Sequence, residues 1–565
     1  MSDEHPGKRQ IVDVMIFSAL LFLLYRKIDG PDIWYHLSIG REVFRTFSVP
    51  LEEFLVYTLA GEPGIFHAWG FGLFYYLIYT LAGFWGMSLA NSALGALVIF
   101  LLFKTERANR SPDPGSILVL CGALWLMQFR LIYRPETALF LLLAGQIYLL
   151  ERFMEDRRWR RLAIIPMLTF LAIQAHPSVL IAMGVYAFYS LQILWDNYRE
   201  NDGAARTAGG LALVGICSVA ASLVNPYGLE QLLMPFTLAA QGEMLKDLVE
   251  FLHIYETEYL LPYIALVIVS AIALVLQPRK RFVYWILFFV FGYMALTYVR
   301  NLALFALVMY VPVARATSYL ADKYIPSNDP VANRLLQSLA AAVVIYTTVA
   351  MVSDSSWGSG PSAGEFPEKS AAVVMELRPP GRVFNFYDMG GYLSWTFDGR
   401  YQVSIDSRQL TKDRSLVLHD QVLTSSKGWE GVLRRYDVNM IIIPATLPYS
   451  GMLIPLAPVL ADSNDWMLAA TEERAMLFLR NGAVPGLPKE RILDKRLVWK
   501  QIISEAAKNI EEYPEHPMAY LALGRARLRA GKRTDAIAPL RRYLQLRPKD
   551  RIYADLLNRL ESAVR

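Results

Sequence analysis

Long apolar segments recur along the first 353 residues of this chain and constrain its fold more than any other feature. A helix needs roughly 20 mainly apolar residues to cross a membrane. Eleven segments approach this requirement, at 10–27, 86–103, 115–132, 136–151, 161–175, 178–195, 208–224, 259–276, 281–298, 300–318 and 334–353. Only 19% of the 565 residues are charged, against about a quarter in soluble domains. The sequence therefore predicts an α-helical, multi-pass membrane protein of about 11 spans.

Basic residues between these segments predict which way the chain crosses the membrane, because Lys and Arg gather in cytoplasmic loops. The basic connectors are Lys104–Arg110, Arg152–Arg161, Asp196–Arg206, Arg279–Arg281 and Arg315–Arg334. All of them fall on the side of the N-terminus if the aromatic segment 67–84 is a re-entrant or interfacial helix instead of a span. We therefore expect a transmembrane domain over 1–353, a cytoplasmic N-terminus and a first outer loop over 28–85.

The composition changes after the last apolar segment. Residues 354–364 are rich in Ser, Gly and Pro, which is typical of a linker. Residues 365–482 alternate short β-rich runs with helical stretches, and this predicts a small extracytoplasmic α/β domain. The β-rich runs are Arg382–Phe386, Tyr401–Ile405, Asn439–Ile443, Trp466–Ala470 and Ala475–Arg480.

Residues 490–565 are charged and have helical periodicity. One stretch has the spacing of a tetratricopeptide repeat (TPR), with small residues where two helices approach and a glycine in the turn between them. The residues at these positions are Tyr520, Leu523, Gly524, Gly531, Ala536, Leu540 and Pro548. We predict a TPR-like helical domain with flanking helices at 494–512 and 551–562, which either covers the α/β domain or binds a partner protein.

The first outer loop carries the leading candidates for chemistry. Asp32 and His36 are four residues apart, so a helix would present them on one face. A carboxylate beside a histidine just outside the first span suits deprotonation of an acceptor hydroxyl or amine, although Asp32 could instead cap the helix that follows Pro31. Farther along, Glu53 is either a second acid or a solvated carboxylate, and His67 either contacts a phosphate or lies at the membrane interface.

Polar motifs also mark the outer ends of later spans. Arg134 could clamp a phosphate, and Glu136 is either a second carboxylate or the ion-pair partner of that arginine. His176 and Asn225 lie in turns that contain proline and are either binding groups or turn formers. Arg300 opens a span on the same face and either binds phosphate or anchors the helix among lipid headgroups. Because such groups are costly at a membrane, their gathering on one face is a functional-site hypothesis.

Several chemistries find no support in the sequence. A net charge of +5, without a basic stripe interleaved with aromatics, argues against nucleic-acid binding. The chain has no P-loop, no GxGxxG after a strand, no GxSxG, and no zinc-ligand or CxxC spacing, so neither ATP-driven nor nicotinamide chemistry is indicated. Cys121 and Cys217 lie in apolar runs, which argues against a disulfide framework or a metal cluster. We expect no cofactor.

Taken in order, these motifs resemble the GT-C superfamily of polytopic glycosyltransferases, which use polyprenyl-phosphate-linked sugar donors. The strings that carry the resemblance are DIWYHLSIGREVFRTFSVP, FHAWGF, YRPE, QAHP, VNPYG and VRNLALF, followed by GGYLSWTFDGRYQVSIDSR at 390–408. The chain is similar in particular to a bacterial group with an outer-face tail that sometimes carries TPRs, which implies the bacterial inner membrane. The resemblance implies Asp32 as the acidic residue of the active site, with Arg134 and Arg300 beside the lipid phosphate. Glu52-Glu53 stands where a clean Asp-x-Asp would sit, which leaves the use of a divalent metal open and assigns no metal ligand.

The resulting hypothesis is an inverting sugar transfer from the lipid donor to a glycan, lipid or protein acceptor on the outer face. Catalysis is assigned to Asp32, His36 and Glu53. The donor phosphate is assigned to Arg134, Arg300, His67 and His176, and substrate binding to Trp34, Tyr35, Glu136, Asn225 and Asn301. The alternatives are an inactive GT-C-like scaffold that anchors the TPR-like domain, and a lipid or sugar transporter. A transporter predicts polar residues at mid-membrane depth and broken helices in repeated halves, which this sequence lacks.

Overall fold

The computed structural model describes most of the chain and divides it into two compact units. The described residues are 6–106, 114–200, 204–239, 252–277, 280–324, 330–408 and 414–564. Parts of the basic connectors predicted at 104–110, 196–206, 279–281 and 315–334 lie outside these ranges. The first unit is made of Met1–Val49 and Ile65–Gly360, and the second of Pro50–Gly64 and Pro361–Arg565.

The first unit is a bundle of helices, and every apolar segment predicted above falls on one of them. The helices are α1 (Pro6–Leu23), α2 (Asp32–Thr46), α3 (Trp69–Glu106), α4 (Pro114–Met127), α5 (Glu136–Asp156), α6 (Ile165–Ile173), α7 (Val179–Glu200), α8 (Ala204–Leu223), α9 (Leu229–Ala239), α10 (Leu260–Leu276), α11 (Phe282–Thr297), α12 (Leu302–Tyr324) and α13 (Pro330–Ser353). Among the described residues, five helices are long and apolar enough to cross a membrane, and five further apolar helices are shorter. The prediction of a helical, multi-pass membrane protein is therefore supported, while the count of eleven crossings stays a prediction.

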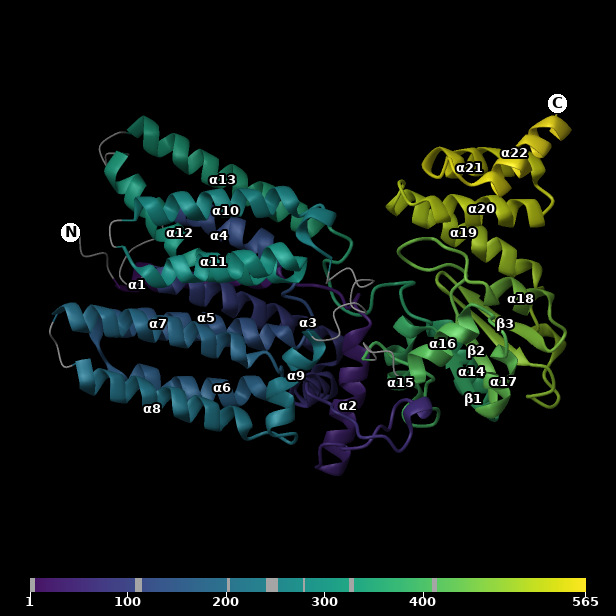
Figure 1. Cartoon of the computed structure of the whole chain (residues 1–565), viewed down its shortest axis with the longest axis horizontal. Coiled ribbons are helices and arrows are strands. Elements are labelled where there is room, and N and C mark those ends of the chain that lie inside the picture. The colour runs from purple at the N-terminus through teal and green to yellow at the C-terminus, as the bar shows by residue number, and fades with distance from the viewer. Residues whose placement is uncertain are drawn as a thin grey trace. The chain divides into compact units, whose positions relative to one another are not determined.

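Helix α2 does not run with the bundle but lies across one end of it (Figure 1). Its packing depends on two glycines, because a Cβ atom on Gly40 would collide with the carbonyl oxygen of Gly72 in α3. Ten of the fifteen residues of α2 are buried, which shows that this helix is an integral part of the unit. We call this end of the bundle the α2 end and the opposite one the far end.

Helix α3 folds back on itself at Gly83. The backbone angles of this residue, φ 59° and ψ −157°, are accessible to glycine and lie outside the helical region. The hydroxyl of Tyr75 donates a hydrogen bond of 3.3 Å to Oδ1 of Asn91. In a straight helix these residues, sixteen apart, would be separated by about 24 Å. The segment predicted at 67–84 thus forms an arm of its own within α3. Its depth in the membrane stays a prediction.

The far end is held by a buried ion-pair network around Glu151 of α5, whose side chain is 1% exposed. Arg281 and Arg315 approach Oε2 of Glu151 at 2.6 and 2.7 Å. The hydroxyls of Tyr189 and Tyr284 donate to Oε1 at 2.9 and 2.7 Å. A single carboxylate therefore joins side chains from four helices, α5, α7, α11 and α12, and from the residue before α11.

The second unit contains a four-stranded sheet in the order β1-β2-β4-β3. Strand β1 (Arg382–Asn385) runs parallel to β2 (Val438–Ile443), while β4 (Ala475–Arg480) is antiparallel to both β2 and β3 (Trp466–Glu472). The helices around it are α14 (Glu368–Leu377), α15 (Gly390–Phe397), α16 (Arg414–Leu423), α17 (Trp429–Arg435) and α18 (Leu456–Asp462). The strand predicted at Tyr401–Ile405 is wrong. That run makes only an isolated bridge, from Val403 to Val56, because the backbone of Val403 bonds to that of Leu55 and Tyr57, while Ser404 and Ile405 bond to the side chain of Asn385 and not to its backbone ladder.

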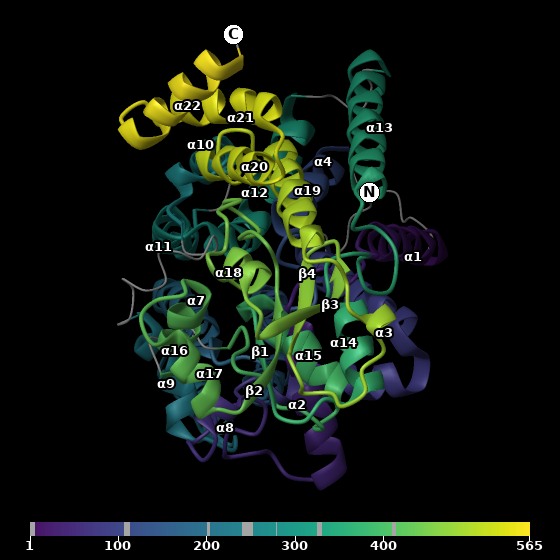
Figure 2. The same ribbon diagram turned by 90° about the vertical axis from the view of Figure 1, so that its right-hand side faces the viewer.

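Four helices complete the second unit, and each packs against the next one along the chain (Figure 2). They are α19 (Arg496–Glu512), α20 (Pro517–Arg529), α21 (Arg533–Leu546) and α22 (Arg551–Val564). A Cβ atom on Gly524 would stand 2.7 Å from Leu540, so glycine permits the close approach of α20 and α21. The turn between them uses Gly531 at φ 76°. This agrees with the predicted helix pair, while its identity as a TPR stays a prediction.

Candidate functional site

Turns between the helices of the first unit meet at the α2 end. The backbone N–H of Gly70, at the start of α3, donates to the carbonyl oxygen of Gln174 after α6, at 2.9 Å. Nε2 of Gln231 in α9 donates to the carbonyl oxygen of His67, also at 2.9 Å. Three turns that are far apart in the sequence therefore form one continuous surface.

Glu136 is the most constrained of the predicted site residues at this end. It is the first residue of α5 and is 5% exposed. One carboxylate oxygen pairs with Arg130, and the other lies 3.3 Å from Nη2 of Arg300. Of the two interpretations of Glu136, the geometry favours the ion-pair partner, and the arginines that contact its carboxylate are Arg130 and Arg300. Two guanidinium groups face one carboxylate. The three side chains together therefore carry one net positive charge.

His176 lies beside this ion pair and contributes a neutral hydrogen-bond donor. Burial lowers its pKa to about 3; the positive charges of Arg300 and Arg130 act in the same direction, and Glu136 opposes them. Nδ1 accepts a hydrogen bond of 3.2 Å from the backbone N–H of Ser178, so the neutral ring carries its proton on Nε2. We refer to Arg130, Glu136, His176 and Arg300 as the Glu136 cluster.

His67 and Arg134 lie near this cluster but have different surroundings. His67 interacts electrostatically with His176. Arg134 interacts with the carboxylate of Asp29, which follows α1 by a few residues. Since Asp32 begins α2 three residues after Asp29, Asp32 and Arg134 belong to the same end of the bundle.

Helix α2 sets Asp32 and His36 four residues apart on one face, as predicted from their spacing. His36 is 1% exposed and its ring lies 5.1 Å from that of Phe71 in α3. Trp34 and Tyr35 are buried as well. Asp32, at the start of the helix, is only partly buried. Of these four side chains, Asp32 is the one most open to a substrate.

The two predicted asparagines make local hydrogen bonds. The side chain of Asn225 donates to the carbonyl oxygens of Ser222 and Gly228 and accepts from the N–H of Tyr227. Nδ2 of Asn301 donates to the carbonyl oxygen of Met294 at 2.9 Å, across the junction of α11 and α12. Asn225 thus has the geometry of a turn former.

Glu53 belongs to the second compact unit and not to the one that contains Asp32. Its carboxylate accepts two hydrogen bonds of 3.0 Å from the guanidinium of Arg408. It also accepts hydrogen bonds from the backbone N–H groups of Leu55 and Val56. Burial disfavours the ionised carboxylate, but Arg408 and these N–H groups outweigh burial and lower the pKa of Glu53 below its ordinary value. This arrangement fastens residues 50–64 to the rest of the second unit.

The lowered pKa of Glu53 predicts a pH-dependent contribution to stability. An acid whose pKa is depressed by folding stabilises above its unfolded pKa and loses that contribution as the pH falls through the folded value. We expect Glu53→Gln to reduce the hydrogen-exchange protection of residues 50–64 at pH 7, by about 1.5–3 kcal/mol for bonds to a charged group. Wild type and variant should converge once the pH falls below the lowered pKa of Glu53 in the folded protein. An equal difference at both pH values would contradict this role.

Arg130 is a site residue that was not predicted from the sequence, although Arg130 and Arg134 both follow the apolar run of α4. A second missed residue is Arg26, which follows α1 and pairs with Asp354 at 3.0 Å. Its Nη2 also donates to Oε1 of Gln128 at 2.9 Å. Within the described ranges, no group of three or more His, Cys, Asp or Glu side chains has the arrangement of a metal site.

The sequence matches no protein-family model and no curated protein. The fold is similar to that of oligosaccharyltransferases from Archaeoglobus fulgidus. The apo form has a TM-score of 0.56 at 13% identity, with 97% of this chain and 87% of that chain covered. The same TM-score and identity are found for AglB in complex with an inhibitory peptide and a dolichol-phosphate, with 95% and 86% covered. A form tethered to an acceptor peptide gives 0.52 at 12% identity, with 83% and 74% covered. At this identity the likeness concerns the fold alone, and it agrees with the predicted helical membrane architecture.

Proposed function

We propose that this protein is a membrane glycosyltransferase of the GT-C type that transfers a sugar from a polyprenyl-phosphate-linked donor to an acceptor on the extracytoplasmic face. The proposal rests above all on the Glu136 cluster, where two arginines and a neutral histidine meet at the end of the bundle at which Asp32 begins α2. The likeness in fold to oligosaccharyltransferases supports the same assignment.

The Glu136 cluster has the chemistry to stabilise a departing lipid phosphate. When the bond between the sugar and the phosphate oxygen breaks, its electron pair stays on that oxygen and adds negative charge. Arg300, which keeps 24% of its side chain exposed, would face this charge, while Arg130 and Glu136 hold it in position. The Nε2–H of His176 would donate a hydrogen bond to the same phosphate. Positive groups that are fixed before the reaction stabilise such charge without reorganising.

Asp32 would take the proton from the acceptor hydroxyl or amine as that group attacks the sugar from the side opposite the phosphate. Arg134 would add positive charge beside Asp29. His36, Trp34 and Tyr35 would support Asp32 through the packing of α2 and not by contact with substrate. Glu53 would position residues 50–64.

The assay reconstitutes the full chain in vesicles with a panel of polyprenyl-phosphate-linked radiolabelled sugars and an envelope extract as acceptor. We expect Arg300→Gln to lower the rate of transfer by about 10²–10³-fold, as does the loss of one donor from an oxyanion site. Arg158→Gln is the matched control, because the side chain of Arg158 is 57% exposed at the far end. Consumption of no donor by the wild type would favour the inactive scaffold, and full activity of Arg300→Gln would remove the cluster from the mechanism.

A further inference from the structure

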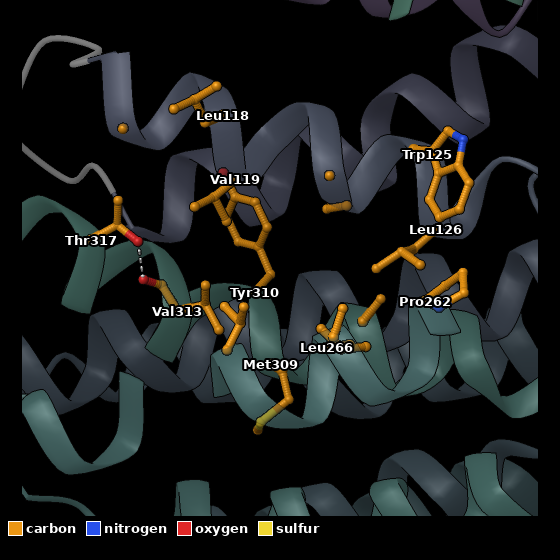
Figure 3. A pocket seen from close by; sticks show the side chains of 16 residues that line it. Leu118, Val119, Trp125, Leu126, Pro262, Leu266, Met309, Tyr310, Val313 and Thr317 are labelled. Carbon is orange, nitrogen blue, oxygen red and sulfur yellow. Dashed lines mark hydrogen bonds between the residues drawn. The ribbon is translucent and has the colours of Figure 1, made fainter. Parts of the chain in front are cut away.

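The last three helices of the second unit, α20, α21 and α22, carry a concentration of positive charge. Residues 517–564 contain eleven Lys and Arg but only four Asp and Glu, an excess of seven positive charges, whereas the whole chain has a net charge of +5. This chemistry is the opposite of that of the cavity of about 460 Å³ between α4, α10 and α12 of the first unit, where none of the sixteen lining residues is charged (Figure 3). The last three helices therefore offer an anionic ligand a surface that this cavity does not.

Most of these cations are exposed and have no carboxylate partner. Ten of the eleven are exposed, and among the described residues two of the ten make an ion pair, Arg529 with Asp462 and Arg541 with Glu561. The eight others are Arg525, Lys532, Arg533, Arg542, Arg547, Lys549, Arg551 and Arg559. The charge that would attract an anion is thus left largely unneutralised by the protein itself.

Five of these cations gather in the two turns that join the helices. We call Lys532 and Arg533 the first basic turn, and Arg547, Lys549 and Arg551 the second. Arg533 and Arg551 are the first residues of α21 and α22, where the partial positive charge of a helix N-terminus disfavours a cation. These two arginines therefore weaken their helices slightly, and the stability of the fold does not account for them.

The two basic turns lie at opposite ends of α21. The fourteen residues of this helix span about 21 Å, which is about twice the screening distance of a charge at physiological salt. A single small anion bound at one turn would leave the other turn without a partner. A ligand that neutralises both must repeat its negative charges along an extended structure.

The same surface offers few apolar contacts. Among the described residues of α20, α21 and α22, Ile552 is the one large hydrophobic side chain that is exposed. Helices that lie on a membrane insert several bulky apolar side chains beside their basic ones, and protein–protein interfaces centre on aromatic anchors. A polymer that carries its charges on a polar backbone suits this surface better than a membrane or a protein does.

We propose that this basic surface binds an anionic polysaccharide that runs along α21 from the first basic turn to the second. The planar guanidinium groups that dominate the surface match the geometry of carboxylates and phosphates. Such a polysaccharide would be the acceptor of the sugar transfer, and this part of the inference rests on the proposed function.

The experiment measures the binding of fluorescein-labelled polygalacturonate to the full chain in phosphatidylcholine nanodiscs by fluorescence anisotropy, between about 50 and 200 mM salt. We expect the affinity to fall steeply with salt, because binding releases counterions from a polyanion. Arg547→Gln/Lys549→Gln/Arg551→Gln should weaken binding about tenfold or more and lower the slope of log affinity against log salt by about two. Lys532→Gln/Arg533→Gln should weaken binding as well, since the polymer reaches both turns.

Arg400→Gln/Lys427→Gln/Lys489→Gln is the matched control. It removes the same number of charges from exposed positions of the second unit outside the three helices, and it should bind the polymer as the wild type does. Undiminished binding by either basic-turn variant, or an equal loss in the control, would overturn the inference. Tighter binding to phosphatidylglycerol vesicles than to the polymer would also overturn it, because the surface would then be a membrane contact.

The binding measurement needs no sugar transfer. A protein that binds the polymer but consumes no donor would refute the proposed function and leave the polysaccharide surface standing. In a protein that transfers sugar, the variants of both basic turns should raise the acceptor KM and leave kcat unchanged. An unchanged acceptor KM would refute the acceptor role alone.

Discussion

Asp32→Asn should lower the rate of sugar transfer by about 10²–10⁴-fold, the usual contribution of a general base. The substitution keeps the size of the side chain and removes the charge that accepts the proton. Because Asp32 is only partly buried at the start of α2, we expect expression and thermal stability to remain those of the wild type. The measurement is the steady-state rate in the reconstituted assay, with kcat lowered and the donor KM little changed.

Glu42→Gln is the matched control for Asp32→Asn, since Glu42 lies in the same helix, ten residues farther along. It removes a carboxylate from α2 without touching the first turn and should transfer sugar at the wild-type rate. Near-normal turnover of Asp32→Asn would exclude Asp32 as the base. A loss of activity in both variants would indicate an effect on α2 as a whole.

Glu151→Gln should destabilise the helical unit by about 3–5 kcal/mol, the cost of breaking a buried ion pair by removing one partner. The substitution leaves Arg281 and Arg315, whose side chains are 12% and 23% exposed, without the carboxylate that both contact. It also weakens the bonds from Tyr189 and Tyr284. The free energy of unfolding in detergent, followed by tryptophan fluorescence, measures the effect.

Glu155→Gln tests whether the destabilisation expected for Glu151→Gln is due to the burial of the Glu151 ion pairs. Glu155 is one turn farther along α5, pairs with Arg152 at 2.8 Å and lies 3.9 Å from Arg315, but its side chain is 42% exposed. Exposed pairs contribute about 0–1 kcal/mol, so this variant should unfold almost as the wild type does. If Glu151→Gln cost no more than Glu155→Gln, the network at the far end would not be what holds the four helices together.

Much of the architecture could be predicted from local sequence patterns. Each of the apolar segments predicted above coincides with a helix, and four of the five β-rich runs are strands of the sheet. The fifth run, Tyr401–Ile405, has the same local pattern but pairs through Val403 with Val56, more than three hundred residues earlier. A strand pattern predicts an extended chain, but the partner of that chain depends on the fold.

The candidate site can likewise be divided into features that local sequence predicts and features that depend on the fold. The spacing of Asp32 and His36 predicts a shared helix face, and the polar residues at the ends of spans predict a common surface. The partners in the ion pairs could not be predicted, since Arg130 and Arg134 are equivalent as sequence signals, and the fold pairs Arg130 with Glu136. Glu53, predicted as a second acid, makes two hydrogen bonds with Arg408, a partner more than three hundred residues away in the same compact unit.

The sequence by itself determined the helices, the strands and the end of the bundle to which the polar motifs belong, because apolar length and periodicity are properties of consecutive residues. Only the tertiary structure decided that Arg130, Glu136 and Arg300 form one cluster and that Glu151 joins four helices. These ion pairs join residues up to 164 positions apart, and their geometry depends on how helices pack against one another, which no local pattern encodes.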